Sequence, residues 1–137
     1  MKLAIDSSSF AKRYVQETGS DKLHLVLQNT SELAFSVILV PEIISALNRR
    51  LREQTLTSRE YQQAKRQLLS DVHDSTLLQI TPSVVAQSVQ LLEKNVLRAM
   101  DALHIACALE WRADLFITSD KKQLDAAVHA GLQCEKL

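Results

Sequence analysis

Glycine and proline are scarce in this chain, with only two of each among 137 residues. Long structureless loops and disordered segments are rich in these residues, so we expect few of either. Apolar runs are short as well, and none approaches the roughly 18 residues that a membrane-spanning helix needs. The opening "MKLAID" places an Asp where a signal peptide would need apolar residues. These absences predict a cytoplasmic protein with no membrane partner.

Cysteines, aromatic residues and excess charge are also limited. Cys107 and Cys134 are too few for a disulfide framework and show no Cys-x-x-Cys spacing. The aromatic fraction is 4%, which excludes extensive base stacking. A formal net charge of zero excludes a uniformly basic nucleic-acid binder, so anion binding must come from local patches or from a bound cation. The 46% of hydrophobic and 23% of charged residues are typical of a globular protein, and the length fits one domain, residues 1–137.

Short apolar segments that predict strands alternate with longer periodic segments that predict helices. The expected strands are 2–5, 32–36, 76–80, 113–118 and, marginally, 132–137. The expected helices are 7–18, 19–29, 40–54, 57–72, 81–95, 97–111 and 120–131. This alternation predicts an α/β fold with a central parallel sheet of four to five strands and helices on both faces.

One expected helix, "LRAMDALHIACALEW" at 97–111, carries a carboxylate at its entrance. After Asp101 the helix is apolar on nearly every side, which is typical of a helix in the interior of a fold. An ionised carboxylate rarely enters an interior unless a partner compensates its charge. Another group, distant in sequence, is therefore expected to meet Asp101.

Four acids fall at the same expected edge of the sheet. Asp6 and Asp120 directly follow the first and fourth strands, and Glu42 and Asp101 lie in the first turns of two helices. In parallel α/β sheets the binding crevice lies beyond the carboxyl ends of the strands, where the strand order reverses. A single acid there is explained by the positive end of a helix dipole. Four together, two of them beside strongly apolar segments, favour a functional site.

Electrostatics indicate a cation at this edge. Two like charges about 5 Å apart repel by roughly 3 kcal/mol at an effective dielectric of 20, whereas helix dipoles return at most about 1–2 kcal/mol each. Protonation of one acid would relieve part of this cost, and a bound divalent cation would relieve more. No His or Cys cluster predicts zinc, so oxygen ligands favour Mg²⁺ or Mn²⁺, as one or two ions. Such a site suits hydrolysis of phosphodiester bonds.

Four segments of the chain resemble PIN-domain proteins of the VapC toxin type. The segments are "MKLAIDSSSFAKRYV", "SVILVPEIISALNR", "LRAMDALHIACALEWRADLFITSDKKQLDAA" and "AGLQCEKL". The likeness covers nearly the whole chain, and its most specific part is Asp-Ala-Leu-His-Ile-Ala followed by a strand and Thr-x-Asp. The resemblance implies a PIN-like fold and the Mg²⁺- or Mn²⁺-dependent endoribonuclease activity of a type II toxin.

The resemblance also implies site residues and partners. The family's catalytic and metal-ligating acids fall on four positions of this chain: Asp6, Glu42, Asp101 and Asp120. Its hydroxyl positions fall on Ser8 and Thr118. Family toxins are usually dimers that a small antitoxin inhibits by covering the acidic groove. The resemblance therefore implies an RNA substrate, a homodimer and a cognate antitoxin encoded elsewhere.

Residues near the acids have less specific predictions. Arg98, one turn before Asp101, is expected to meet phosphate or to balance the acids. His104 shares a helix face with Asp101, and we favour a structural hydrogen bond over contact with substrate. The serines at 7–9 are expected to cap the following helix. For Thr118, capping and a role in the site are equally open.

Other proteins with acidic sites fit the sequence less well. A receiver domain needs an acidic pair after the first strand and a lysine after the fifth, which "AIDSSS" and "LQCEKL" do not supply. A metal-dependent adhesion module needs Asp-x-Ser-x-Ser, but Phe10 stands at its last position. A haloacid-type phosphatase needs an Asp where Ser8 stands. The open alternative is an RNA-binding or regulatory PIN-fold module with little or no cleavage activity.

Overall fold

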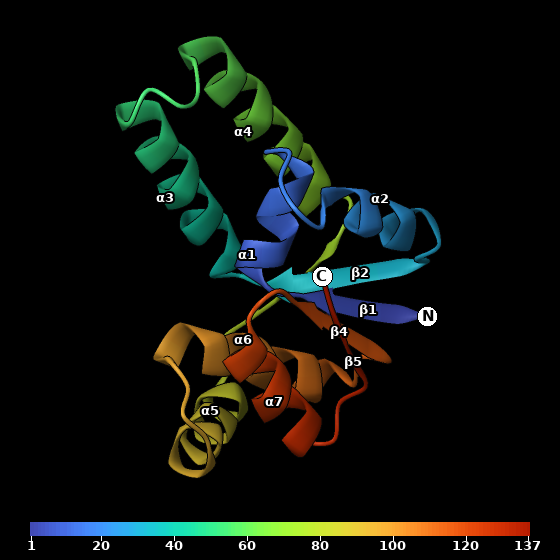
Figure 1. Cartoon of the computed structure of the whole chain (residues 1–137). Helices are drawn as coiled ribbons and strands as arrows, with labels where there is room; N and C mark the ends of the chain where they lie inside the picture. The colour runs from blue at the N-terminus through green and yellow to red at the C-terminus, as the bar shows by residue number, and fades with distance from the viewer.

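Five parallel strands lie between two layers of helices in the computed structural model, which describes residues 1–137 (Figure 1). The strands are β1 (Lys2–Ile5), β2 (Glu32–Ser36), β3 (Thr76–Leu78), β4 (Leu115–Thr118) and β5 (Cys134–Lys136). Their order is β3-β2-β1-β4-β5, and every neighbouring pair is parallel. The predicted α/β fold is confirmed, and the marginal segment 132–137 contributes the fifth strand.

Helices cover both faces of this sheet. They are α1 (Ser7–Phe10), η1 (Ala11–Arg13, a 3₁₀ turn), α2 (Ser20–Gln28), α3 (Leu39–Arg52), α4 (Ser58–His73), α5 (Pro82–Lys94), α6 (Ala99–Trp111) and α7 (Lys121–His129). Figure 1 shows α1 to α4 on one face and α5 to α7 on the other. It also shows that α3 and α4 form a hairpin that projects beyond the sheet.

Two hydrophobic clusters fill the spaces between the sheet and its helices. Leu3 and Ile5 of β1 belong to the cluster beneath α1 to α4, whereas Ala4 between them belongs to the cluster beneath α5 to α7. This alternation follows from the twofold period of a strand. Ile105 and Ala106 of α6 are fully buried in the second cluster. The apolar character of 97–111 is thus explained, because α6 lies in the interior.

Several expected helix ends are confirmed. Thr57 caps α4 in a capping box with Glu60, and Thr81 caps α5 just before its first-turn proline. Gly131 lies just beyond α7 with a φ of 100°, a left-handed conformation in which glycine is not strained.

The expected helix 7–18 is wrong in length and in its cap. Helix α1 ends at Phe10, and a 3₁₀ turn follows it to Arg13. The buried hydroxyl of Ser20 donates to the carbonyl of Lys12 (2.8 Å) and accepts from the N–H of Glu17 (3.0 Å). These bonds satisfy backbone groups after the helix stops, and they depend on a residue outside the predicted segment. The cap of α1 is Asp6, not a serine.

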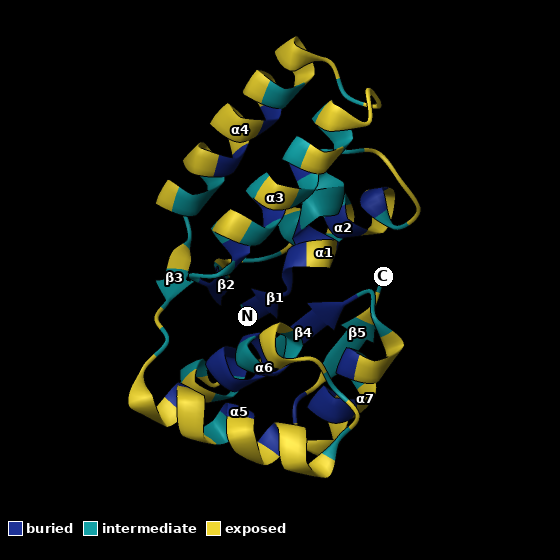
Figure 2. Ribbon diagram, turned by 90° about the vertical axis from the view of Figure 1, so that its left-hand side faces the viewer, coloured by how far each residue is buried: buried dark blue, intermediate teal, exposed yellow.

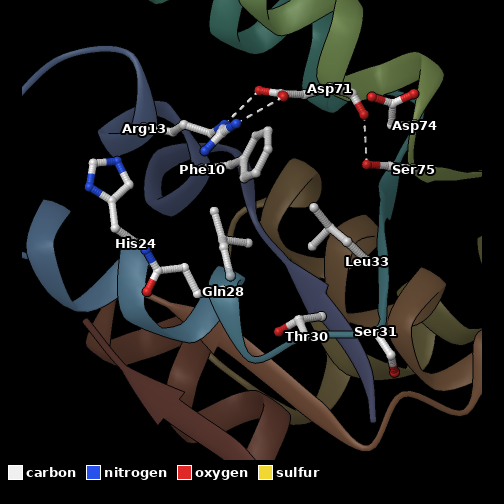
Figure 3. Close-up of a pocket in the computed structure, with 11 residues that line it drawn as sticks. Phe10, Arg13, His24, Gln28, Thr30, Ser31, Leu33, Asp71, Asp74 and Ser75 are labelled. Atoms are coloured by element: carbon white, nitrogen blue, oxygen red, sulfur yellow. Dashed lines mark hydrogen bonds and ion pairs between the residues drawn. The ribbon is translucent and has the colours of Figure 1, made fainter.

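An ion pair connects α4, near the base of the helical hairpin, to the 3₁₀ turn η1 (Figure 3). Arg13 donates two hydrogen bonds to Asp71 of α4, through Nε (2.7 Å) and Nη2 (3.1 Å). The hydroxyl of Tyr14 donates to the same carboxylate (2.6 Å). Burial alone would raise the pKa of Asp71, but these hydrogen bonds outweigh it and hold the pKa below its ordinary value. The polar hollow beside this pair contains none of the four predicted acids.

Candidate active site

The four predicted acids lie at the carboxyl edge of the sheet, where β1 and β4 end side by side. Asp6 immediately follows β1, and its N–H donates to the carbonyl of Ile117 in β4 (3.2 Å). Asp120 follows β4 after one residue and caps α7. Glu42 and Asp101 lie in the first turns of α3 and α6. The strand order runs outward in both directions from this pair, so the acids occupy the expected crossover point.

Asp6 is a buried carboxylate without a cationic partner. Its side chain caps α1 by accepting from the N–H of Ser9 (3.1 Å), and its other oxygen accepts from the hydroxyl of Ser8 (2.8 Å). The residue is 3% exposed, and no ion pair in the structure includes it. Burial raises the pKa of Asp6, and the hydrogen bonds from Ser9 and Ser8 together with the charge of His104 offset only part of this effect. The ionised form of Asp6 is therefore under-compensated in the protein alone.

Glu42 is held by two residues from other elements. Its Oε1 accepts from the hydroxyl of Ser7 (2.7 Å) and lies 2.7 Å from Nε2 of His104. Burial alone would raise the pKa of Glu42, but the hydrogen bonds from His104 and Ser7 outweigh it and lower the pKa. Glu42 is thus an ionised carboxylate with one oxygen fixed.

The charge of Asp101 is compensated by an ion pair with an arginine just before the same helix. It accepts a hydrogen bond from Nε of Arg98 (3.1 Å), whose side chain is 84% exposed. This hydrogen bond raises the pKa of Arg98, and the negative charges of Asp120 and Glu42 add to the effect. The positive charge of Arg98 is therefore stabilised by three of the four acids, as expected of a residue that balances their negative charge. Arg98, Asp101 and Asp120 line one surface hollow.

Asp120 belongs to a network that connects the ends of β4, α6 and α7. It accepts from the N–H of Gln123 (3.0 Å), and its own N–H donates to the hydroxyl of Thr118 (3.1 Å). Thr118 donates to Oε1 of Gln123 (2.6 Å) and lies 3.4 Å from Asp6. The amide of Gln123 in turn donates to the carbonyl of Asp101 (3.2 Å). Thr118 thus both supports the cap of α7 and contacts the site.

The acids converge on one edge but do not form a closed cage. No three His, Cys, Asp or Glu side chains are grouped closely enough in this structure to hold a metal ion. Glu42 opens onto a neighbouring groove that Arg49 and Arg52 also line. The expected mutual repulsion among four acids is not what raises the pKa of Asp6, because burial of that one carboxyl is the leading cause.

Sequence reasoning placed the acids and missed part of their support. Ser8, which the resemblance assigns to a hydroxyl position of the family, donates to Asp6, and the structural hydrogen bond favoured for His104 is present, but its acceptor is a predicted site residue. The role of Ser7 as a cap is wrong, since its hydroxyl binds Glu42. Gln123 was missed although it is fully buried. Its position three residues after a capping Asp was the available signal.

Comparison with known proteins identifies the family. The PIN domain family model matches residues 3–128, and the chain belongs to this family. The chain is 29% identical to Ribonuclease VapC45 of Mycobacterium tuberculosis over 104 residues, which are 76% of this chain and 72% of that protein. No helix of the structure has the length and apolarity that a bilayer span requires.

Solved structures share the fold at low sequence identity. A toxin–antitoxin complex from Klebsiella pneumoniae superposes with a TM-score of 0.68 at 16% identity, over 90% of each chain. The Mycobacterium tuberculosis toxin VapC20, described as cleaving the sarcin-ricin loop, superposes with a TM-score of 0.69 at 18% identity, over 95% of each chain. The PIN fold predicted from the sequence is confirmed.

Proposed function

We propose that this protein is a metal-dependent endoribonuclease and the toxin of a type II toxin–antitoxin pair. The observation that carries the proposal is Asp6, a buried carboxylate that forms no ion pair, at the edge where Glu42, Asp101 and Asp120 also lie. The likeness to a ribonuclease named VapC, over about three quarters of both chains, supports the same activity.

The donor set fits a hard divalent cation. All four candidate ligands are carboxylates, which suit Mg²⁺ or Mn²⁺ and not zinc. The charge of a cation beside Asp6 would compensate the cost of burying that carboxylate. Asp6, Glu42, Asp101 and Asp120 would hold one or two ions, with water and substrate phosphate completing the coordination. When bound, the cation would polarise the scissile phosphate and lower the pKa of an attacking water.

The protein's own residues would orient the acidic side chains and contact the substrate. Ser8 and the N–H of Ser9 keep the carboxylate of Asp6 in one rotamer, and Ser7 does the same for Glu42. Arg98 is largely exposed and bonded only to Asp101, so its guanidinium can turn toward a substrate phosphate without unfolding anything.

An RNA path leads away from these acids along α3. Glu42 and Arg49 are seven residues apart and so share a face of the helix. Arg49 and Arg52 have no ion-pair partner in the structure, and both line the groove that reaches Glu42. Two free guanidinium groups beside an acidic centre suit phosphates that flank the cleaved bond. Recognition would then depend on the backbone and shape of an RNA loop.

The decisive experiment incubates purified, antitoxin-free protein with total RNA, with and without Mn²⁺, and maps the new ends. We expect ends that require the metal and that disappear in Asp101→Asn. The matched control is Asp125→Asn, because Asp125 is an exposed acid of α7 that pairs only with Lys121. RNA binding that survives Asp101→Asn, without cleavage by the wild type, would instead identify the binding module.

The partners we propose are a homodimer copy and an antitoxin. The antitoxin is supported by the fold's likeness to the toxin–antitoxin complex from Klebsiella pneumoniae. The homodimer is supported by an apolar stripe of exposed residues on and just beyond α5: Val85, Val89, Leu92 and Val96. Within α5, Val85, Val89 and Leu92 are spaced by four and three residues, the heptad pattern of a helix that packs on another helix, and Val96 extends the apolar surface just beyond the end of the helix. Figure 2 shows this outer face of α5 uncovered.

A further inference from the structure

We propose that His104 is a positioning residue, which fixes Glu42 so that one carboxylate oxygen stays free for the cation and substrate. This inference rests on the proposed nuclease function. It concerns a residue that the sequence pattern assigned only to structure.

The geometry shows a three-way contact in which Glu42 is the only member that is partly exposed. Nε2 of His104 lies 2.7 Å from Oε1 of Glu42 and 3.0 Å from the hydroxyl of Ser7, which itself lies 2.7 Å from Oε1. His104 is 4% exposed and Ser7 is 8% exposed. Two buried side chains therefore hold one oxygen of Glu42, and no hydrogen bond in the structure reaches its other oxygen, Oε2.

The direction of these hydrogen bonds follows from the chemistry of the groups. A carboxylate oxygen only accepts, so a 2.7 Å contact requires that Nε2 carries the hydrogen. The hydroxyl of Ser7 donates to Glu42 and can accept from Nε2 at the same time. This arrangement is not a nucleophilic triad, because such a triad needs one histidine nitrogen for each partner. Here Nδ1 is buried without a hydrogen-bond partner, so all of the ring's polar contacts pass through Nε2.

A role limited to the core would not produce this arrangement. An apolar residue at position 104 would fill the space and avoid the burial of an unpartnered Nδ1. The histidine instead connects α6 to the first turn of α3 at the predicted ligand. Partners that orient metal-binding carboxylates typically change metal affinity or activity by about 10- to 100-fold when they are removed.

The test compares three substitutions by Mn²⁺ titration and by cleavage kinetics. In His104→Gln, the amide N–H lies about as far from the backbone as Nε2, whereas in His104→Asn it reaches only the position of Nδ1. We expect His104→Leu and His104→Asn to weaken Mn²⁺ binding and to lower kcat by about tenfold or more, with little change in KM for RNA. His104→Gln should restore most of both losses.

A double-mutant comparison separates positioning from packing. Because His104 acts through Glu42, adding His104→Leu to Glu42→Gln should cause no further loss of Mn²⁺ affinity. Equal additional loss in both backgrounds, or equal properties of the Gln and Asn variants, would overturn the inference. If His104→Leu does not fold, the comparison of His104→Gln with His104→Asn tests the inference by itself. Wild-type protein that neither binds Mn²⁺ nor cleaves RNA would refute the proposed function itself, whereas wild-type activity with an unaffected His104→Leu refutes only this inference.

Discussion

Asp6 carries an electrostatic cost of burial that the rest of the protein offsets only in part. Its carboxylate is buried, its hydrogen-bond donors are neutral, and its pKa is raised by burial. A group whose pKa is raised on folding destabilises the fold when the pH exceeds its unfolded value. At neutral pH, ionised Asp6 therefore reduces the stability of the metal-free protein, and a bound cation would reverse this effect.

Asp6→Asn should leave the melting temperature of the metal-free protein unchanged or raise it. Asparagine caps a helix about as well as aspartate and removes the buried charge. Asp101→Asn should also be nearly neutral, because its partner Arg98 is largely exposed to solvent, and an ion pair with so exposed a partner contributes only about 0–1 kcal/mol. The measurement is thermal unfolding in EDTA. A clear decrease for both variants would contradict the account of the site.

At this scale the sequence predicted positions better than contacts. Asp6 and Asp120 follow strands, so their place at one edge follows from parallel topology alone. The contact between Ser7 and Glu42 joins residues 35 apart, and no local pattern encodes it. Likewise, burial of Gln123 depends on how α7 meets α6.

The helical hairpin of α3 and α4 projects beyond the sheet (Figure 1). Its connection at the base is the hydrogen-bonded pair of Arg13 and Asp71, with Tyr14 as a second donor. Because the pKa of Asp71 is lowered on folding, this pair stabilises the protein above the unfolded value of about 4. Its contribution is lost as the pH falls through the lower, folded pKa.

Asp71→Asn should destabilise the protein by about 1.5–3 kcal/mol at neutral pH, the range for hydrogen bonds to charged groups. The difference between wild type and variant should shrink as the pH is lowered from 5 to below 3. Urea unfolding at several pH values measures it. A difference that is independent of pH would show that the charge of Asp71 is not involved.

The arginines on the face of α3 beside Glu42 are expected to bind the RNA backbone. Arg49→Ala should raise KM for RNA several-fold with little change in kcat, and should reduce the salt dependence of binding by about 0.7 in log–log slope. Arg59→Ala is the matched control, since Arg59 is an exposed arginine near the start of α4 that does not line the groove beside Glu42. Equal effects of both changes would indicate a diffuse charge effect and not a path along α3.

The sequence predicted the ends of helices only where the signal for the end is local. Caps such as Thr57 and Thr81 are local, and the structure has helices where they predicted them. Helix 7–18 was predicted too long, because the chain turns at residues satisfied by Ser20 of the next helix. The period of "AKRYVQET" carries no information about that tertiary contact.

The whole molecule should be a dimer if the stripe on α5 is covered by a second copy. Combined substitution Val89→Asp and Leu92→Asp should convert a dimer to a monomer in light scattering, because it places charge in the centre of the heptad seam. Val128→Asp is the control, as Val128 is an exposed valine on α7, outside the stripe. A wild-type monomer at all concentrations, or an effect of Val128→Asp equal to that of the seam, would refute this assembly.

The most direct test of the cation site is a crystal of the protein grown with Mn²⁺ and examined by anomalous scattering. We expect a peak about 2.1 Å from an oxygen of Asp6, with at least two of Glu42, Asp101 and Asp120 turned toward it. An empty edge at saturating Mn²⁺, or a peak confined to other acids such as Asp71 and Asp74, would contradict the claim that Asp6 is the centre of a metal site.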